Sequence, residues 1–241
     1  MKTIFALVAS ICMCGAVMAA PINQNVRQVT IGTAVGGDSV QDILDDSFAN
    51  STDADTDQSV HGYFGVATPA STSILPQFIV KNTATAAIGI YSVDGAFDTT
   101  SSLTEYEIFS SSAGEDWTAT VKWTTDTSGK ITVFDDQGDI VGSQTSFSGL
   151  DKNGFGFYGE TTTRYYSMDD LNSGGAAKVL TYQDGSTTNW GFFFETGTNT
   201  DYNEAFMFVE SITGVVPEPG TYALFGLAAL GYGVIRRRRR A

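Results

Sequence analysis

Hydrophobic and polar residues alternate along most of the chain between residues 27 and 213, and short polar turns separate the alternating runs. In residues 117–123 the odd positions are Trp, Ala, Val and Trp, whereas the even positions are Thr, Thr and Lys. A period of two places these two sets on opposite faces of a strand. The pattern therefore predicts a half-buried antiparallel strand in this stretch.

Further strands are predicted wherever β-branched and aromatic residues recur between turns. They lie at 27–33, 77–82, 86–93, 104–111, 130–138, 139–147, 154–161, 177–184, 190–196 and 205–213. The intervening "DTSG" and "DDQGD" have the composition of hairpin turns. So many short strands predict an all-β fold, an antiparallel β-sandwich of jelly-roll type.

One stretch follows a helical period instead. In residues 38–50 the apolar Val40, Ile43, Leu44 and Phe48 recur at helical spacing, and the Asp-Ser pair at 38–39 can supply the N-cap. The sequence therefore predicts one short helix near the N-terminus of the sandwich.

The first 19 residues have the pattern of a secretory signal peptide, with one early lysine, an apolar stretch and small residues at its end. Val17 and Ala19 fit positions −3 and −1 of a cleavage site after Ala19. Both cysteines, Cys12 and Cys14, lie in the segment that would be removed. The mature chain would then have no disulfide and no thiolate ligand.

The last 26 residues, 216–241, form a segment of different composition. A Pro-Glu-Pro-Gly sequence is followed by fifteen apolar or small residues and then five arginines. As a helix the apolar run would span about 22 Å, which is less than the roughly 30 Å hydrocarbon core of a bilayer. We expect a short hydrophobic tail helix, with the arginines as a cytoplasmic stop and the preceding domain, residues 20–215, on the outer side of the membrane.

The domain between the two ends is strongly acidic. Lys2 and Arg236 to Arg240 make up six of the 13 basic residues, and Glu218 is one of the 27 acidic residues. The rest of the chain therefore carries 7 basic and 26 acidic residues, a net charge of −19. Such a charge repels nucleic acid and supplies many carboxylates for cations.

The order of signal peptide, exported domain, Pro-Glu-Pro, apolar run and arginine cluster resembles that of proteins with a PEP-CTERM sorting signal. The matching motif is Pro217, Glu218, Pro219 and Gly220, followed by the stop-transfer residues Arg236, Arg237, Arg238, Arg239 and Arg240. The resemblance implies transient anchoring in the inner membrane of a Gram-negative bacterium, cleavage near Pro217 to Pro219 by an exosortase, and transfer to the cell surface or to an exopolysaccharide matrix. A plain single-pass tail anchor is the alternative.

The domain itself is similar to a family of unknown function that is common among proteins with such tails. The matching stretches are Phe155 to Tyr158, Leu171 to Gly175, Phe194 with Glu195, and Asn199 to Glu204. The family pattern ends in D-x-D-Y-N-D. This chain departs from it, since Asn199 stands in place of the first aspartate, and Thr196 and Glu204 replace others.

Several oxygen-bearing side chains crowd into ten residues of this last segment. They are Glu195, Asn199, Asp201, Asn203 and Glu204, with Gly197 allowing the chain to turn. Calcium takes six to eight oxygen ligands in irregular geometry, so these residues are a candidate calcium site. The alternative is that Asp201 and Asn203 are turn residues bonded to nearby backbone amides. The alternating aspartates of 53–57 are a second, less complete candidate for calcium.

Catalytic patterns are absent from the sequence. The single histidine, His61, would have to serve any Ser-His-Asp arrangement, and no Gly-x-Ser-x-Gly elbow occurs. We therefore expect no enzyme, and a structural or adhesive protein of the cell surface or extracellular matrix. The alternatives are a calcium-dependent carbohydrate-binding module and, third, a surface glycoside hydrolase. The tryptophans Trp117, Trp123 and Trp190 could stack on sugars, but their strand positions favour the core.

Overall fold

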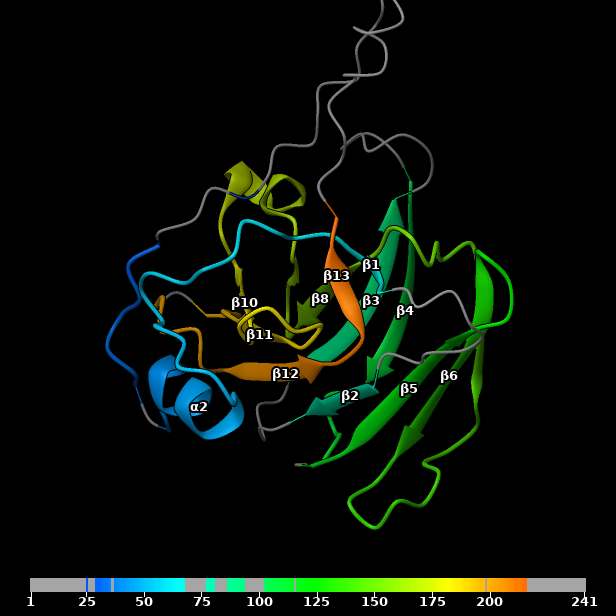
Figure 1. The fold of residues 1–241 in the computed structure, drawn as a ribbon. Coiled ribbons are helices and arrows are strands. Elements are labelled where there is room, and N and C mark those ends of the chain that lie inside the picture. The colour runs from blue at the N-terminus through cyan, green and yellow to red at the C-terminus, as the bar shows by residue number, and fades with distance from the viewer. Residues whose placement is uncertain are drawn as a thin grey trace, which may run out of the picture. The chain divides into compact units, whose positions relative to one another are not determined.

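The computed structural model describes residue 25 and residues 29–35, 37–67, 77–80, 86–93, 102–114, 116–197 and 199–215. Within these residues the chain forms antiparallel sheets and a single α-helix (Figure 1). The all-β class predicted from the alternating pattern is therefore confirmed.

Two sheets make up most of the fold, and their strands pair antiparallel throughout. The larger sheet has the order β10 (Val179–Gln183), β11 (Trp190–Phe194), β12 (Ala205–Val209), β2 (Gln77–Val80), β5 (Thr118–Trp123), β6 (Ser128–Phe134) and β7 (Thr145–Ser148). The smaller sheet has the order β4 (Leu103–Phe109), β3 (Ala87–Val93), β8 (Gly156–Glu160) and β9 (Arg164–Tyr166). A separate pair joins β1 (Phe64–Val66) to β13 (Ile212–Gly214).

One hydrophobic core lies between the two sheets. The smaller sheet contributes Ile88, Ile90, Ile108 and Phe157. The larger sheet contributes Val121, Ile131, Phe192 and Met207, among others. Alternate residues of each strand are thus removed from water against the facing sheet, which is the arrangement of a β-sandwich. The predicted face of residues 117–123 is confirmed, since Ala119 and Val121 are fully buried and Lys122 is exposed.

Strands β10, β11 and β12 are buried on both of their faces. Phe192 and Phe194 point into the core between the sheets, whereas Phe193 belongs to a second cluster on the outer face. That outer cluster is covered by the helix α2 (Val40–Ser47), which lies against these strands in Figure 1. Two-sided burial explains why residues 190–194 read as an unbroken apolar run rather than an alternating one.

The helix begins where the sequence predicts it. Ser39 Oγ accepts a hydrogen bond from Asp42 N at 3.2 Å, and Asp42 Oδ2 accepts one from Ser39 N at 3.1 Å. This reciprocal capping box satisfies two amides that the first helical turn leaves free. Val40, Ile43 and Leu44 are buried against the outer face of the larger sheet.

The structure differs from the predicted strands in several stretches. The strand expected at 27–33 is wrong for the described residues 29–33, because Val29 N donates to the Gln58 side chain and Gly32 N to Thr200 O instead of to a neighbouring strand. Within the strand expected at 139–147, only the part from Thr145 is a strand. The short strands β1 and β9 were not predicted.

The two-sided burial predicts a large effect of Phe193→Ala. Phe193 is 0% exposed and packs against Tyr182, Phe206 and Phe208. We expect the free energy of unfolding to fall by about 3–5 kcal/mol, because the substitution leaves a cavity in a closely packed cluster. Ile140→Ala, at a residue that is 55% exposed, is the control and should change it by less than about 0.5 kcal/mol. Urea denaturation measures both, and equal values for the two variants would contradict the account.

Candidate functional site

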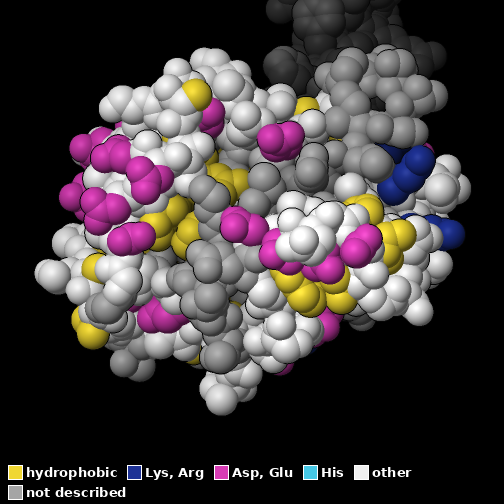
Figure 2. Space-filling view, turned by 90° about the horizontal axis from the view of Figure 1, so that it is seen from below, with side chains coloured by type: hydrophobic (Ala, Val, Ile, Leu, Met, Phe, Trp, Pro, Cys, Tyr) yellow, Lys and Arg dark blue, Asp and Glu magenta, His cyan; other side chains and the backbone are white. Residues whose placement is uncertain are grey.

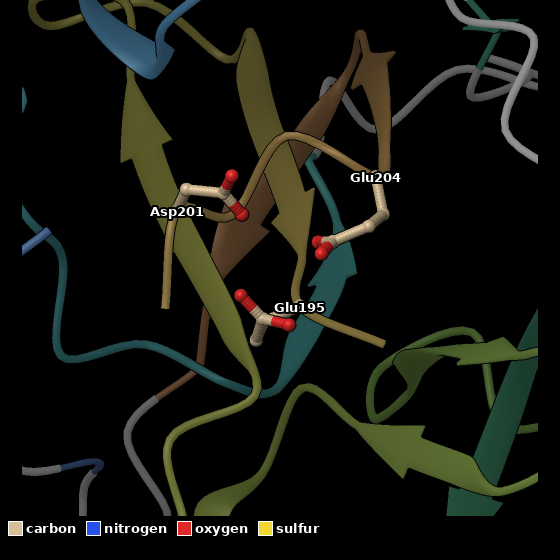
Figure 3. Close-up of side chains that lie close together, drawn as sticks. All are labelled: Glu195, Asp201 and Glu204. Carbon is tan, nitrogen blue, oxygen red and sulfur yellow. The ribbon is translucent and has the colours of Figure 1, made fainter. Parts of the chain in front are cut away.

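Three carboxylates meet at one end of the β11–β12 hairpin. Glu195 follows the last residue of β11, Glu204 precedes the first residue of β12, and Asp201 lies in the loop between them. Each offers an oxygen atom within 4.8 Å of the others, and Figure 3 shows the three groups turned toward one another. The structure thus brings together three of the five residues predicted as calcium ligands.

The strand register places two of these acids directly opposite each other. Phe194 pairs with Ala205 in the β11–β12 ladder, so Glu195 and Glu204 occupy the next cross-strand position. Like charges at such a position destabilise a sheet, and burial strengthens their repulsion. Glu195 is 0% exposed. The hairpin therefore holds an unfavourable pair that needs a compensating positive charge or a proton.

The loop carries Asp201 inward through strained backbone. Thr200 and Tyr202 have φ angles of 64° and 54°, a left-handed conformation that costs energy for residues other than glycine. Tyr202 is 1% exposed and its hydroxyl donates to Ala177 O at 2.7 Å, which fixes the loop to the segment just before β10. Asp201, between these two residues, is itself only 1% exposed.

Hydrogen bonds satisfy only part of the carboxylate oxygens. Glu195 Oε1 accepts from Gly197 N at 2.7 Å, and Asp201 Oδ2 accepts from Val35 N at 2.9 Å. Asp201 Oδ1 and Glu204 Oε2 are buried and accept no hydrogen bond. Among the ion pairs that the described residues form, none involves these carboxylates. Two oxygens therefore remain without the donors that buried oxygens ordinarily have.

The two predicted amide ligands behave differently. A methyl group placed on Gly197 would lie 3.0 Å from Asn199 Oδ1 and 3.1 Å from an oxygen of Glu195 and of Glu204. Asn199 thus faces the same small volume as the acids. Asn203 instead contacts the N-terminal segment, where its Nδ2 donates to Asp38 O at 3.3 Å.

The three neighbouring carboxylates affect the pKa of Glu204. Burial, followed by the negative charges of Glu195 and Asp201, raises the pKa of Glu204 to about 7. The arrangement can do two things chemically. It can share a proton among the carboxylates, or it can hold a cation between them.

The acidic loop at 53–57 has a different arrangement. Asp53 Oδ1 accepts hydrogen bonds from the amides of Asp55 and Thr56, and Asp57 Oδ2 accepts one from Asp53 N. These bonds lower the pKa of the exposed Asp53 carboxyl. Such short-range bonds are typical of Asx turns, so the aspartates here shape the loop.

His61 lies in a separate hollow. Its Nδ1 is 3.0 Å from Ser59 Oγ, and its ring packs edge-on against Trp190. Burial lowers the pKa of His61. A cavity of about 550 Å³ adjoins this histidine, and the residues lining it include Asp57 and Gln183 but none of the three clustered carboxylates. Within the described residues no carboxylate is hydrogen-bonded to His61.

Comparison with protein families gives one match. The model of the PEP-CTERM protein-sorting motif matches residues 215–240. The chain carries a PEP-CTERM sorting motif. The match includes the predicted Pro217, Glu218, Pro219 and Gly220 and the arginines 236–240, which lie outside the described residues. No curated protein and no solved structure matches the chain.

The motif supports export, transient membrane anchoring and processing by an exosortase. The signal peptide predicted at 1–19 lies outside the described residues, as does the tail. Across the part of the chain that the structure describes, no helix is long and apolar enough to span a bilayer. The similarity of residues 155–204 to a family of unknown function stays a prediction, because the match covers only the tail.

The raised pKa of Glu204 predicts how stability depends on pH in the absence of added metal ions. Between about pH 4.5 and 7 the folded protein keeps a proton that the unfolded chain has released. Its stabilising effect is therefore present below pH 4.5 and is lost as the pH rises through 7. We expect the free energy of unfolding to fall by about 1 kcal/mol between pH 5 and pH 7.5 through this group. The effect is small because solvent screens a partly exposed carboxyl.

Urea denaturation in chelator at pH 5 and pH 7.5 measures this change. Glu204→Gln is the comparison, since it removes the titrating group and retains its shape. The lowered pKa of His61 contributes with the opposite sign and is common to both proteins. The prediction would be contradicted if the free energy of unfolding changed equally between the two pH values in the wild-type protein and in Glu204→Gln.

Proposed function

We propose that this chain is an exported protein that an exosortase processes and that then resides at the cell surface or in the exopolysaccharide matrix, with a structural or adhesive role. The observation that carries the proposal is the PEP-CTERM motif at residues 215–240. A motif of this kind governs where the protein goes. The role of the sandwich has to be argued from its own surface and side chains.

The surface of the sandwich favours an extracellular role. Acidic side chains are spread over the face seen in Figure 2, whereas Lys and Arg appear only near one margin. The net charge of −19 outside the two ends repels nucleic acid and anionic membranes. It also keeps copies of the protein apart, which suits a soluble domain released from a membrane tether.

Two features argue against catalysis. His61 contacts Ser59 and Trp190, and within the described residues it lacks the carboxylate partner of a catalytic triad. The carboxylate pair Glu195 and Glu204 could in principle serve a glycoside hydrolase. However, Glu195 is fully buried, and neither acid lines the cavity beside His61. The cavity beside His61 therefore gives no support to a glycoside hydrolase at this pair.

The tryptophans weaken the carbohydrate-binding alternative. Trp190 is 2% exposed and its Nε1 donates to Ile212 O at 3.2 Å. Trp123 Nε1 donates to Leu150 O at 2.7 Å and its ring stacks on Phe155. Trp117 also packs against the core. These contacts support the fold, as the strand positions predict, and they give no support to a stacking platform for sugars.

The sorting step can be tested with a variant in which Pro217 and Pro219 are both replaced by alanine. In a host with an exosortase, we expect most of the wild-type protein outside the membrane fraction and most of the variant inside it, because the protease no longer recognises the tail. Immunoblotting of cell fractions measures both. Glu210→Ala, at an exposed acid of the sandwich, is the control and should be released like wild type. Equal release of the double proline variant and of the wild-type protein would contradict the proposal.

A further inference from the structure

Two buried carboxylate oxygens at the β11–β12 hairpin accept no hydrogen bond, and a bound cation would stabilise them. Asp201 is 1% exposed, and its Oδ1 accepts no hydrogen bond. Glu204 Oε2 is in the same state, and Glu195 is 0% exposed beside them. A buried carboxylate oxygen that accepts no hydrogen bond and has no counterion is strongly disfavoured. The turn alternative leaves this observation unexplained, because turn residues bond their oxygens to nearby amides.

We propose that Glu195, Asp201 and Glu204, together with Asn199, bind a calcium ion that closes the β11–β12 loop. The distances fit this assignment. Two oxygens that each lie about 2.4 Å from one ion are at most about 4.8 Å apart. The three carboxylates meet that limit, and the amide oxygen of Asn199 faces the same volume from the exposed side. This site goes beyond the sorting function and is independent of it.

The ligand chemistry selects calcium among common cations. All the side-chain donors are oxygens, which excludes the soft metals that prefer sulfur and nitrogen. The donors come from two strand ends and the loop between them, so no single rigid element sets their geometry. Calcium accepts such irregular sets and completes its six to eight ligands with backbone carbonyls or water, whereas magnesium demands near-octahedral geometry.

Binding at this place would also hold the N-terminal segment, residues 29–38. Val35 N donates to Asp201 Oδ2 at 2.9 Å, and Gly32 N donates to Thr200 O at 2.8 Å. Asn203 adds a contact to Asp38 O. The segment leads directly into α2, which covers the outer face of β10–β12. The ion would therefore stabilise the β11–β12 loop, which binds the segment that leads into α2.

Calorimetric titration of the full-length protein in mild detergent, stripped with chelator, tests the proposal with calcium as the probe. We expect one calcium per chain. Asp201→Asn and Glu204→Gln should each weaken binding at least tenfold, because each removes a ligand charge. Asp55→Asn, an equal change of charge in the exposed loop at 53–57, should alter it less than twofold. Magnesium should bind at least tenfold more weakly than calcium.

Thermal melting of the same proteins distinguishes lost binding from lost folding. In chelator, Asp201→Asn and Glu204→Gln should melt at or above the wild-type temperature, because they remove an uncompensated charge. In excess calcium the order should reverse, since only the wild-type protein gains stability from the ion. A protein that binds no calcium, or variants that bind as wild type does, would overturn the site. Equal affinity for magnesium would overturn the choice of calcium.

Hydrogen exchange gives a readout of the N-terminal segment. Calcium should slow exchange of the Gly32 and Val35 amides at least tenfold, because their acceptors lie in the loop that the ion closes. Asp201→Asn should abolish this slowing. Unchanged exchange in the presence of bound calcium would overturn the role of the ion in holding the segment.

Discussion

Burial of β10, β11 and β12 on both faces is the constraint on which the rest of the domain depends. One face forms the core with the smaller sheet, and the other needs a cover of its own. Helix α2 and the segment before it supply that cover, with Val40 and Leu44 each 1% exposed. Because these strands carry large aromatic side chains on both faces, neither layer is stable in water without the other.

The same constraint accounts for the carboxylate cluster. Strands that are apolar on both sides have to end where polar residues begin, and on β11 and β12 those residues are Glu195 and Glu204. The antiparallel register then sets the two acids opposite each other. The loop adds Asp201, which lies between two residues in the left-handed conformation. These acids would destabilise a hairpin by repelling one another, and this repulsion is the basis of the calcium site proposed above.

Local patterns in the sequence predict what depends on neighbouring residues. The alternation at 117–123, the capping pair before α2 and the turn at 135–139 are all found in the structure. The carboxylate cluster could be predicted for the same reason, since its members lie within one hairpin. Contacts between distant residues could not be predicted. Gly32 bonds to Thr200, and Asn203 to Asp38, across more than 160 residues. Residues 29–33 have the composition of a strand, but they bond to this distant loop instead of pairing in a sheet.

Short strands escaped prediction for a related reason. β1 and β9 have three residues each, too few to show a period. β9 pairs with the longer β8, and β1 pairs with the equally short β13, so each is a strand only through its partner. The role of Val35 at the site was also hidden, because a backbone amide leaves no mark in the sequence. The tail is the opposite case, because Pro-Glu-Pro, an apolar run and arginines define it in sequence alone.

We propose that the acidic sandwich is exported on a C-terminal tail that an exosortase then removes. The most direct test is the intact mass of the protein recovered from outside a cell that has an exosortase. The account predicts a chain that lacks residues 1–19 and ends near Pro217 to Pro219. Recovery only from the membrane, with the full mass of 25.7 kDa, would contradict it.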